Sequence, residues 1–308
     1  MEKRPFIIDC DTGTDDAIAI IAAVNSPEIE VKAITSVNGN IHQEYVCQNN
    51  LDLIELLGRD IPVAKGAEKP LFDIGRKNAE KIHGKKGLGT VTLPPAQHSK
   101  FHPTIASELI YQTAVEEAGQ LELLVIGPMT NIAIALIQHT DLADKIKHIW
   151  FMGGAVKGGN VTNVAEFNIW ADPEACREVL GSGIPMTMVG LDVTERSNLL
   201  PEDEIRLRGA ETPGAAFAAD ILQFMFNRRK DGEKTAYMHD SLALAAAIYP
   251  ECLTCREYYV EVECGDKIGS GHTEVDLRGE SGREANVSVA MDVDAAKFRK
   301  WLVDRVSQ

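Results

Sequence analysis

Residues 5–24 read PFIIDCDTGTDDAIAIIAAV, an apolar run followed by an aspartate-rich turn and a second apolar run. The first run, residues 5–10, is typical of a strand that is buried on both faces. Gly13 permits a tight turn, and Thr14 is a residue type that caps the start of a helix, here over residues 15–25. The order strand, turn, helix predicts the first half of a strand–helix–strand unit.

The same alternation continues along the chain. Short β-branched runs predict further buried strands at 31–37, 61–64, 122–127, 148–152 and 185–190. Helical patterns separate or follow them at 43–57, 104–118, 131–137 and 173–180. This repetition predicts an α/β fold with right-handed crossovers: an open, mostly parallel, Rossmann-like sheet with flanking helices. Ligands of such sheets bind beyond the carboxyl ends of the strands, which is where we expect the chemistry.

The last third of the chain has a different pattern. Helices are predicted at 212–229 and 239–249, and alternating strands at 257–264, 272–277 and 286–291, before a final amphipathic helix at 294–306. We therefore expect a small antiparallel β element near the C-terminus. No repeat or obvious linker interrupts the pattern, so residues 1–308 are expected to form a single domain.

Composition excludes several classes of function. The chain has 31 Lys and Arg against 46 Asp and Glu, a net charge of −15, which argues against non-specific nucleic-acid binding and against anionic membranes. The first residues lack the hydrophobic stretch of a signal peptide, and the apolar run 17–24 is too short to span a bilayer. The six cysteines are spread over the whole length, as in reduced proteins. We expect a soluble cytoplasmic protein.

Four aspartates lie within eight positions of the first turn: Asp9, Asp11, Asp15 and Asp16. A helix dipole favours acids in its first turn, which explains Asp15 and Asp16 but not the two on the strand. So many like charges need a cation, and oxygen-only ligands indicate Mg²⁺ or Ca²⁺. One enzyme class with this start is a Mg²⁺-dependent phosphohydrolase of haloacid dehalogenase type, with Asp9 as nucleophile, although its downstream lysine and paired acidic motif are not found.

A second class matches several separated motifs. DCDTGTDD (9–16) resembles the D-x-D-x-G-x-D-D signature of the inosine–uridine-preferring nucleoside hydrolase family, with Thr12 where many members have proline. Other matches follow in family order: VNGN (37–40), KIHGKKGLG (81–89), GPMTN (127–131), FMGGA (151–155), AEFNIWADPEA (165–175), GLDVT (190–194) and MHDS (238–241). The resemblance covers essentially the whole chain and implies a Rossmann-like sheet with its site at the strand carboxyl ends.

The resemblance also implies a site. Ca²⁺ would be held by three carboxylates and one backbone carbonyl, and it would bind the 2′ and 3′ hydroxyls of a ribonucleoside; the implied ligands are Asp11, Asp16, Asp240 and Ile126. Asp11 would be the general base on the attacking water, so that the products are free base and ribose. The ribose would be bound by Asp15 and Asn40 at its 2′ and 3′ hydroxyls, by Asn160, Glu166 and Asn168 on its 3′ and 5′ side, and by Met152 beneath the ring.

The base side stays open at this stage. His239 is a candidate to protonate or orient the leaving base, and His83 resembles the loop histidine of pyrimidine-specific or broadly specific members. The basic run Arg228–Arg229–Lys230 fits either a phosphate site or a solvated helix end. Relatives of this kind are commonly dimers or tetramers in nucleoside salvage, so a homo-oligomer is expected. A non-catalytic nucleoside-binding protein of the same fold is the remaining alternative.

Overall fold

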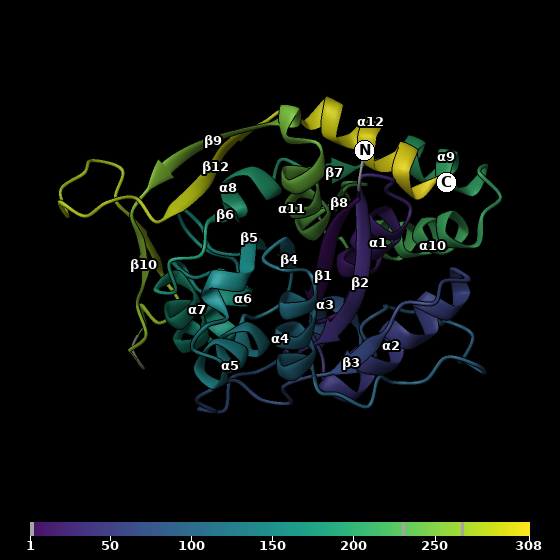
Figure 1. Cartoon of the computed structure of the whole chain (residues 1–308). Helices are drawn as coiled ribbons and strands as arrows, with labels where there is room; N and C mark the ends of the chain where they lie inside the picture. Colours follow the sequence, from purple (N-terminus) through teal and green to yellow (C-terminus); the bar gives the residue numbers. More distant parts are fainter. Residues whose placement is uncertain (1–2, 230–231, 266–267) are drawn as a thin grey trace.

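The computed structural model describes residues 3–229, 232–265 and 268–308. Its centre is an eight-stranded sheet in the order β3-β2-β1-β4-β5-β6-β12-β9, parallel except for the edge strand β9 (Figure 1). The strands are β1 (Arg4–Cys10), β2 (Ile29–Ser36), β3 (Val63–Lys65), β4 (Leu121–Val125), β5 (Ile146–Met152), β6 (Met186–Val189), β9 (Leu253–Tyr258) and β12 (Val287–Val293). Two antiparallel pairs lie outside this sheet: β7 (Asn198–Leu199) with β8 (Ala236–Tyr237), and β10 (Val260–Val262) with β11 (Thr273–Val275).

Helices flank the sheet. They are α1 (Thr14–Val24), α2 (Gln43–Leu56), α3 (Glu80–His83), α4 (Ala106–Glu116), α5 (Thr130–Gln138), α6 (Phe167–Ala171), α7 (Pro173–Leu180), α8 (Leu191–Thr194), α9 (Pro201–Arg208), α10 (Pro213–Arg228), α11 (His239–Ile248) and α12 (Ala295–Val306), with 3₁₀ turns η1 (Ala143–Lys145) and η2 (Pro250–Cys252). No helix among the described residues is long and apolar enough to cross a membrane.

The core is divided by the sheet into two clusters. Successive strand residues point to opposite faces, so Phe6 and Ile8 of β1 join the cluster built with α1, α10, α11 and α12, while Ile7 joins the one built with α4, α5 and α7. In Figure 1 these helix groups lie on opposite sides of the strands, with α12 along the top and α4, α5 and α7 below. Burial on both faces explains the near-continuous apolar runs of β1 and β4.

The predicted fold class is confirmed, with two differences in detail. The run predicted as one strand at 257–264 divides into β9 and β10, and β9 with β12 extends the central sheet, so that only the β10–β11 hairpin stands apart at this end. Thr14 is not the N-cap of α1: Gly13 is, and its N–H is bound at 2.9 Å by Oδ2 of Asp16. The side chain of Asp16, in the first turn of α1, therefore caps the helix by accepting the N–H of Gly13.

Strand order locates the site. From β1 the chain moves to β2 and β3 on one side, whereas β4, β5 and β6 lie on the other. The connections leaving β1 and β4 therefore go in opposite directions, which opens a crevice at their carboxyl ends. Asp11 follows β1 and Ile126 follows β4, so both residues lie at this switch point.

Candidate active site

Three buried aspartates, two of them predicted metal ligands and one a predicted ribose ligand, come from two helix starts. Asp15 and Asp16 lie in the first turn of α1, and Asp240 in the first turn of α11, which packs against α1. One carboxylate oxygen from each of the three lies within 4.8 Å of the others, and all three residues are buried. Both helix dipoles favour negative charge at this point. The described residues thus hold a buried group of acids that can bind a metal ion.

The hydrogen bonds of Asp11 and Asp16 leave one oxygen of each free. Oδ2 of Asp11 accepts the backbone N–H of Asn40 at 2.7 Å, and Oδ2 of Asp16 accepts the N–H of Gly13 and Nδ2 of Asn40 at 3.2 Å. Oδ1 of each is buried and has no partner within the described part of the chain. A buried oxygen without a partner is costly, and a carboxylate especially so. The two free oxygens therefore fit a hard cation.

Burial and mutual repulsion act on the same acids. Burial, followed by the neighbouring charge of Asp15, raises the pKa of Asp16 to about 7. Burial and then Asp16 raise the pKa of Asp11 well above its usual range, and burial and then Asp15 do the same for Asp240. A divalent cation favours the ionised forms and would reverse these shifts. The donor set is consistent with a metal that binds oxygen.

Ile126, Met152 and Asn168 meet at the ends of β4 and β5. Nδ2 of Asn168 lies 3.1 Å from the carbonyl oxygen of Ile126 and 3.1 Å from that of Met152, with the sulfur of Met152 at 3.4 Å. The carbonyl of Ile126 is thus bound by a side chain rather than by a neighbouring strand, and its second lone pair is left for a ligand. The structure brings these three predicted residues together.

Glu166 and Asn160 shape the loop that carries Asn168. Glu166 caps α6: its carboxylate accepts the N–H groups of Asn168, Ile169 and Gly154 at 2.9 to 3.2 Å, and burial raises its pKa to about 7. Asn160 is exposed, and its Oδ1 accepts the N–H of Phe167 at 2.9 Å. The Nδ2 group of Asn160 and the second lone pair of its Oδ1 therefore remain for a substrate.

The two histidines are held in defined orientations. Nδ1 of His83 lies 3.1 Å from the backbone nitrogen of Thr14, whose N–H must donate, so the ring proton of neutral His83 is on Nε2. Burial lowers the pKa of His83 to about 4. Nδ1 of His239 lies 2.8 Å from the hydroxyl of Thr194, and burial lowers the pKa of His239 as well. Both rings are neutral near pH 7 in this arrangement and suit hydrogen bonding more than permanent positive charge.

Asp9 is not a nucleophile. Its side chain is fully buried, and its Oδ1 accepts from Nδ2 of Asn131 at 2.7 Å and from the hydroxyl of Thr35. Burial raises the pKa of Asp9 to about 7. The alternative of a phosphohydrolase with a nucleophilic Asp9 is therefore not supported, because hydrogen bonds from Thr35 and Asn131 hold this carboxylate within the fold. Instead it joins β1 to the end of β2 and the start of α5.

The basic run at the end of α10 differs from one of its two predicted interpretations, the solvated helix end. Arg228 and Arg229 are half-buried rather than solvated. Nη1 of Arg228 donates to the carbonyl of Ile82, next to His83, while Arg229 donates to Thr235. Lys230 lies outside the described residues. Sequence patterns missed the contacts of Arg228 with Ile82 and of Thr14 with His83, because a local pattern does not show which loop lies against a helix end.

Comparisons with known proteins agree with this geometry. Residues 6–300 match the family described as inosine-uridine preferring nucleoside hydrolase. The chain is 42% identical, over 98% of both chains, to a pyrimidine-specific ribonucleoside hydrolase RihA of Escherichia coli O9:H4 (strain HS). Among solved structures it is similar to a purine-preferring ribonucleoside hydrolase from Gardnerella vaginalis, with a TM-score of 0.92, 31% identity, and coverage of 99% of this chain and 98% of that one. An inosine-guanosine nucleoside hydrolase gives a TM-score of 0.89 at 32% identity, covering 98% of each chain.

Proposed function

The chain belongs to the inosine-uridine preferring nucleoside hydrolase family, and from this premise we propose that it is a Ca²⁺-dependent enzyme releasing free base and ribose from ribonucleosides. Hydrolysis of the N-glycosidic bond of ribonucleosides is the activity of the family. The observation that carries the metal dependence is the pair of buried, partnerless oxygens, Oδ1 of Asp11 and Oδ1 of Asp16, beside the carboxylates of Asp15 and Asp240.

The proposed ligands are the carboxylates of Asp11, Asp16 and Asp240 and the backbone carbonyl of Ile126. Ca²⁺ accepts six to eight oxygens in a flexible shell, so protein oxygens, ribose hydroxyls and a water can share it. When bound, the ion would lower the pKa of a water and fix the vicinal hydroxyls of the sugar. Mg²⁺ demands a stricter octahedron, which a shell of carboxylates from two helices and one strand end suits less well.

Asp11 is the proposed general base. Its Oδ2 is oriented by the N–H of Asn40 and keeps a second lone pair that can accept a proton from the attacking water, while Oδ1 is left for the metal. The water oxygen then bonds to the anomeric carbon as the bond from that carbon to the base nitrogen breaks. The sugar acquires positive charge in this step, and the surrounding carboxylates stabilise it.

The ribose is proposed to bind between two groups of polar side chains. Asp15 and Asn40 would hold the 2′ and 3′ hydroxyls, and Asn160, Glu166 and Asn168 the 3′ and 5′ side, above Met152. Amide groups suit hydroxyl ligands because they both donate and accept. The buried position of four of these polar side chains, close to the carboxyl ends of the strands, supports the proposal: Asp15, Asn40, Glu166 and Asn168.

The base side is proposed to be formed by His83 and His239. Nε2–H of His83 is free to donate to a base, and His239 is the candidate for delivering a proton to it. This chain is 42% identical to a relative named pyrimidine-specific and 31% identical to the one named purine-preferring. We therefore expect uridine and cytidine to be hydrolysed faster than inosine.

A chromatographic panel of ribonucleosides, deoxyribonucleosides and 5′-monophosphates tests the function. Free base from uridine, and little from deoxyuridine, is expected, because the deoxy sugar lacks the 2′ hydroxyl. Treatment with EDTA should abolish turnover, and Ca²⁺ should restore it better than Mg²⁺. Phosphate release without free base would contradict the proposal, as would chelator-insensitive turnover. Binding without turnover would favour a sensor instead.

The cellular setting belongs to the same proposal. We expect the whole chain to act as one domain, as a homodimer or homotetramer, in nucleoside salvage in the cytoplasm. Light scattering coupled to size-exclusion chromatography tests the assembly, with a monomer mass of 33.6 kDa as the reference. A mass of one chain at all concentrations would contradict the oligomer.

A further inference from the structure

Arg228 ends α10 and connects it to the loop that carries His83. Its Nη1 donates to the carbonyl of Ile82, which precedes His83 in α3. Phe224, one turn earlier on α10, lies against Gly89 of the same loop, because a Cβ at Gly89 would be 2.4 Å from its ring. The guanidinium is therefore held at a defined place over the loop and is not a freely moving surface charge.

The charge of Arg228 faces the base side of the cleft. Ile82, which accepts its hydrogen bond, immediately precedes His83, and Nδ1 of His83 accepts the N–H of Thr14, next to Asp15. The charge of Arg228 also helps, after burial, to lower the pKa values of His83 and His239, in agreement with this position. Burial lowers the pKa of Arg228, and the negative charge of Asp15 acts against this shift. Arg228 thus belongs with the histidines.

Two donor groups of Arg228 remain available. Within the part of the chain that the structure describes, Nε and Nη2 have no hydrogen-bond partner, whereas Nη1 has the carbonyl of Ile82. A guanidinium is a donor only and keeps its charge even when it is half-buried. Its fixed fork suits an acceptor oxygen that becomes negative during the reaction. A carbonyl group on a nucleobase is such an acceptor.

We propose that Arg228 is a base-binding catalytic residue that donates a hydrogen bond to a carbonyl oxygen of the leaving base. The inference rests on the proposed function. As the bond from the anomeric carbon to the base nitrogen breaks, its electron pair moves into the base and reaches the carbonyl oxygen. Arg228 stabilises this negative charge and transfers no proton. The water supplies hydroxide to the sugar, and the base nitrogen gains one proton, so the sum is nucleoside plus water to base plus ribose.

Two other roles for Arg228 compete with this one. A phosphate at the 5′ position would need the guanidinium on the other side of the ribose and away from Asp15. A purely structural role would consist of the bond to Ile82 alone, which holds the His83 loop. The structural role predicts equal loss for every substrate, because the loop covers all of them, whereas a base contact predicts loss only where the base needs stabilisation.

Arg228→Met tests the proposal with two leaving groups. Uridine and inosine have bases that carry carbonyl groups and leave poorly, because the departing base must be stabilised. In p-nitrophenyl riboside the ribose is the same, but the leaving group is stable as an anion without help from the protein. We expect kcat/KM to fall about 10- to 100-fold for the two nucleosides, as for loss of a hydrogen bond to a charged group. The value for p-nitrophenyl riboside should stay within about threefold. Arg228→Lys should recover part of the loss, because the charge remains.

Arg229→Met is the matched control. Its guanidinium stacks over Tyr237 at 5.3 Å and bonds Thr235, so we expect both substrates to change by less than about threefold. Equal loss of both substrates in Arg228→Met would overturn the base contact in favour of the structural role, and no change would overturn it outright. Faster turnover of uridine 5′-monophosphate than of uridine, lost in Arg228→Met, would assign the residue to phosphate. If the wild type hydrolyses neither substrate, the proposed function itself fails.

Discussion

At the scale of single residues, Asp11 is the test of the proposed chemistry. Asp11→Asn keeps an acceptor for the N–H of Asn40 but removes the negative charge and the basic oxygen. We expect kcat to fall by at least about 10³-fold, in the range of lost general-base catalysis. The melting temperature of the metal-free protein should not fall, because a buried charge is removed. Asp60→Asn, at an exposed site, is the control, and full activity in Asp11→Asn would disprove the assignment.

Glu166 gives a pH dependence at the same scale. Burial raises its pKa to about 7 from 4.5, so the folded protein binds the proton more tightly than the unfolded chain. This group contributes stability that is fully present below pH 4.5 and lost as pH rises through 7, by about 3 kcal/mol in total. Glu166→Gln should flatten the fall in unfolding free energy between pH 5 and 8, measured by denaturant titration with saturating Ca²⁺. The readout is the slope of the unfolding free energy against pH and not its absolute value. The substitution also removes the carboxylate oxygen that accepts the N–H of Gly154, which changes the stability at every pH. An unchanged slope would refute the shift.

Sequence revealed some of these residues and not others for a physical reason. Asp11, Asp15 and Asp16 were predicted because they are neighbours in one turn, where charge repulsion can be seen in the sequence. The contact of Thr14 with His83 joins residues 69 positions apart, and that of Arg228 with Ile82 joins residues 146 apart. Such contacts depend on where a long loop lies against two helix ends, and no local pattern encodes that.

At the scale of elements, the β10–β11 hairpin supports the ribose-side loop. The hydroxyl of Thr273 on β11 donates to the carbonyl of Ala155 at 2.7 Å and accepts its N–H at 3.0 Å. His272 donates through Nδ1 to the carbonyl of Val164, in the segment between the proposed ligands Asn160 and Glu166. The hairpin therefore holds both ends of the loop that carries Glu166, although it lies outside the main sheet.

Thr273→Val should weaken this support. The variant keeps the shape of the side chain but leaves the N–H and carbonyl of Ala155 without partners, at about 2–3 kcal/mol. We expect a lower melting temperature and a raised KM for ribonucleosides, with a smaller effect on kcat. Glu261→Gln, at an exposed position on β10, is the control. If KM is unchanged while stability falls, the hairpin is a stability element only and does not position the loop.

The element scale also shows the limit of periodicity. Residues 257–264 alternate as one strand would, and the prediction of one strand followed. In the structure the strand ends at Tyr258, because β12 pairs with β9 only up to Val287 opposite Tyr258, and the next residues turn to meet β11. The parallel strands were predicted more accurately. They are buried on both faces, so each is a continuous apolar run whose ends are visible in the sequence, whereas an alternating pattern does not show where one strand ends and the next begins.

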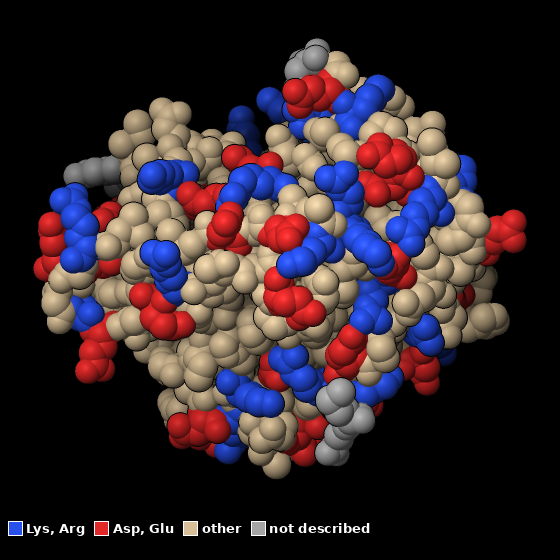
Figure 2. All heavy atoms as spheres, turned by 90° about the horizontal axis from the view of Figure 1, so that it is seen from above, with Lys and Arg blue, Asp and Glu red and all other residues tan. Residues whose placement is uncertain are grey.

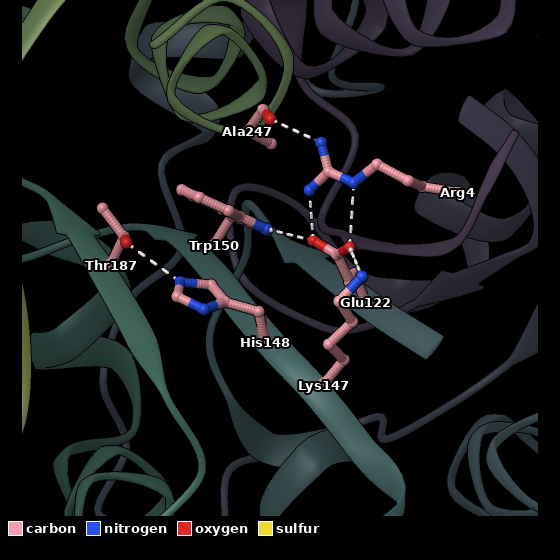
Figure 3. A network of polar contacts seen from close by, with 7 residues as sticks. All are labelled: Arg4, Glu122, Lys147, His148, Trp150, Thr187 and Ala247. Carbon is pink, nitrogen blue, oxygen red and sulfur yellow. Dashed lines mark hydrogen bonds and ion pairs between the residues drawn. The ribbon is translucent and has the colours of Figure 1, made fainter. Parts of the chain in front are cut away.

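At the scale of the whole molecule, stability and chemistry occupy opposite ends of the sheet. On the face shown in Figure 2, acidic and basic side chains are interspersed, so the net charge of −15 does not gather there. The acids with proposed roles in metal and ribose binding lie buried at the carboxyl ends of the strands. Figure 3 shows a second polar group toward the amino ends, where Arg4, Trp150 and Lys147 converge on Glu122.

Helix α11 connects this second polar group to the candidate active site. Arg4 at the start of β1 donates through Nε to Glu122 at 2.9 Å and through Nη1 to the carbonyl of Ala247 at 2.7 Å. Ala247 lies in the last turn of α11, where a cation is favoured by the helix dipole, and Asp240 lies in the first turn of the same helix. Arg4 thus fixes the far end of the helix that supplies a proposed metal ligand.

Arg4→Met should therefore destabilise the fold without changing the chemistry. Glu122 is only 2% exposed and would lose its main partner, while Arg4 is 32% exposed, so the loss should be about 2–3 kcal/mol, less than for a fully buried pair. The melting temperature should fall by about 5 °C or more. The value of kcat/KM at 25 °C should stay unchanged, because the first turn of α11, which carries Asp240, keeps its packing. The double variant Arg4→Met, Glu122→Leu should recover most of the loss, because no uncompensated charge remains. A fall in kcat/KM in the single variant that the double variant does not restore would show instead that α11 transmits the change to Asp240.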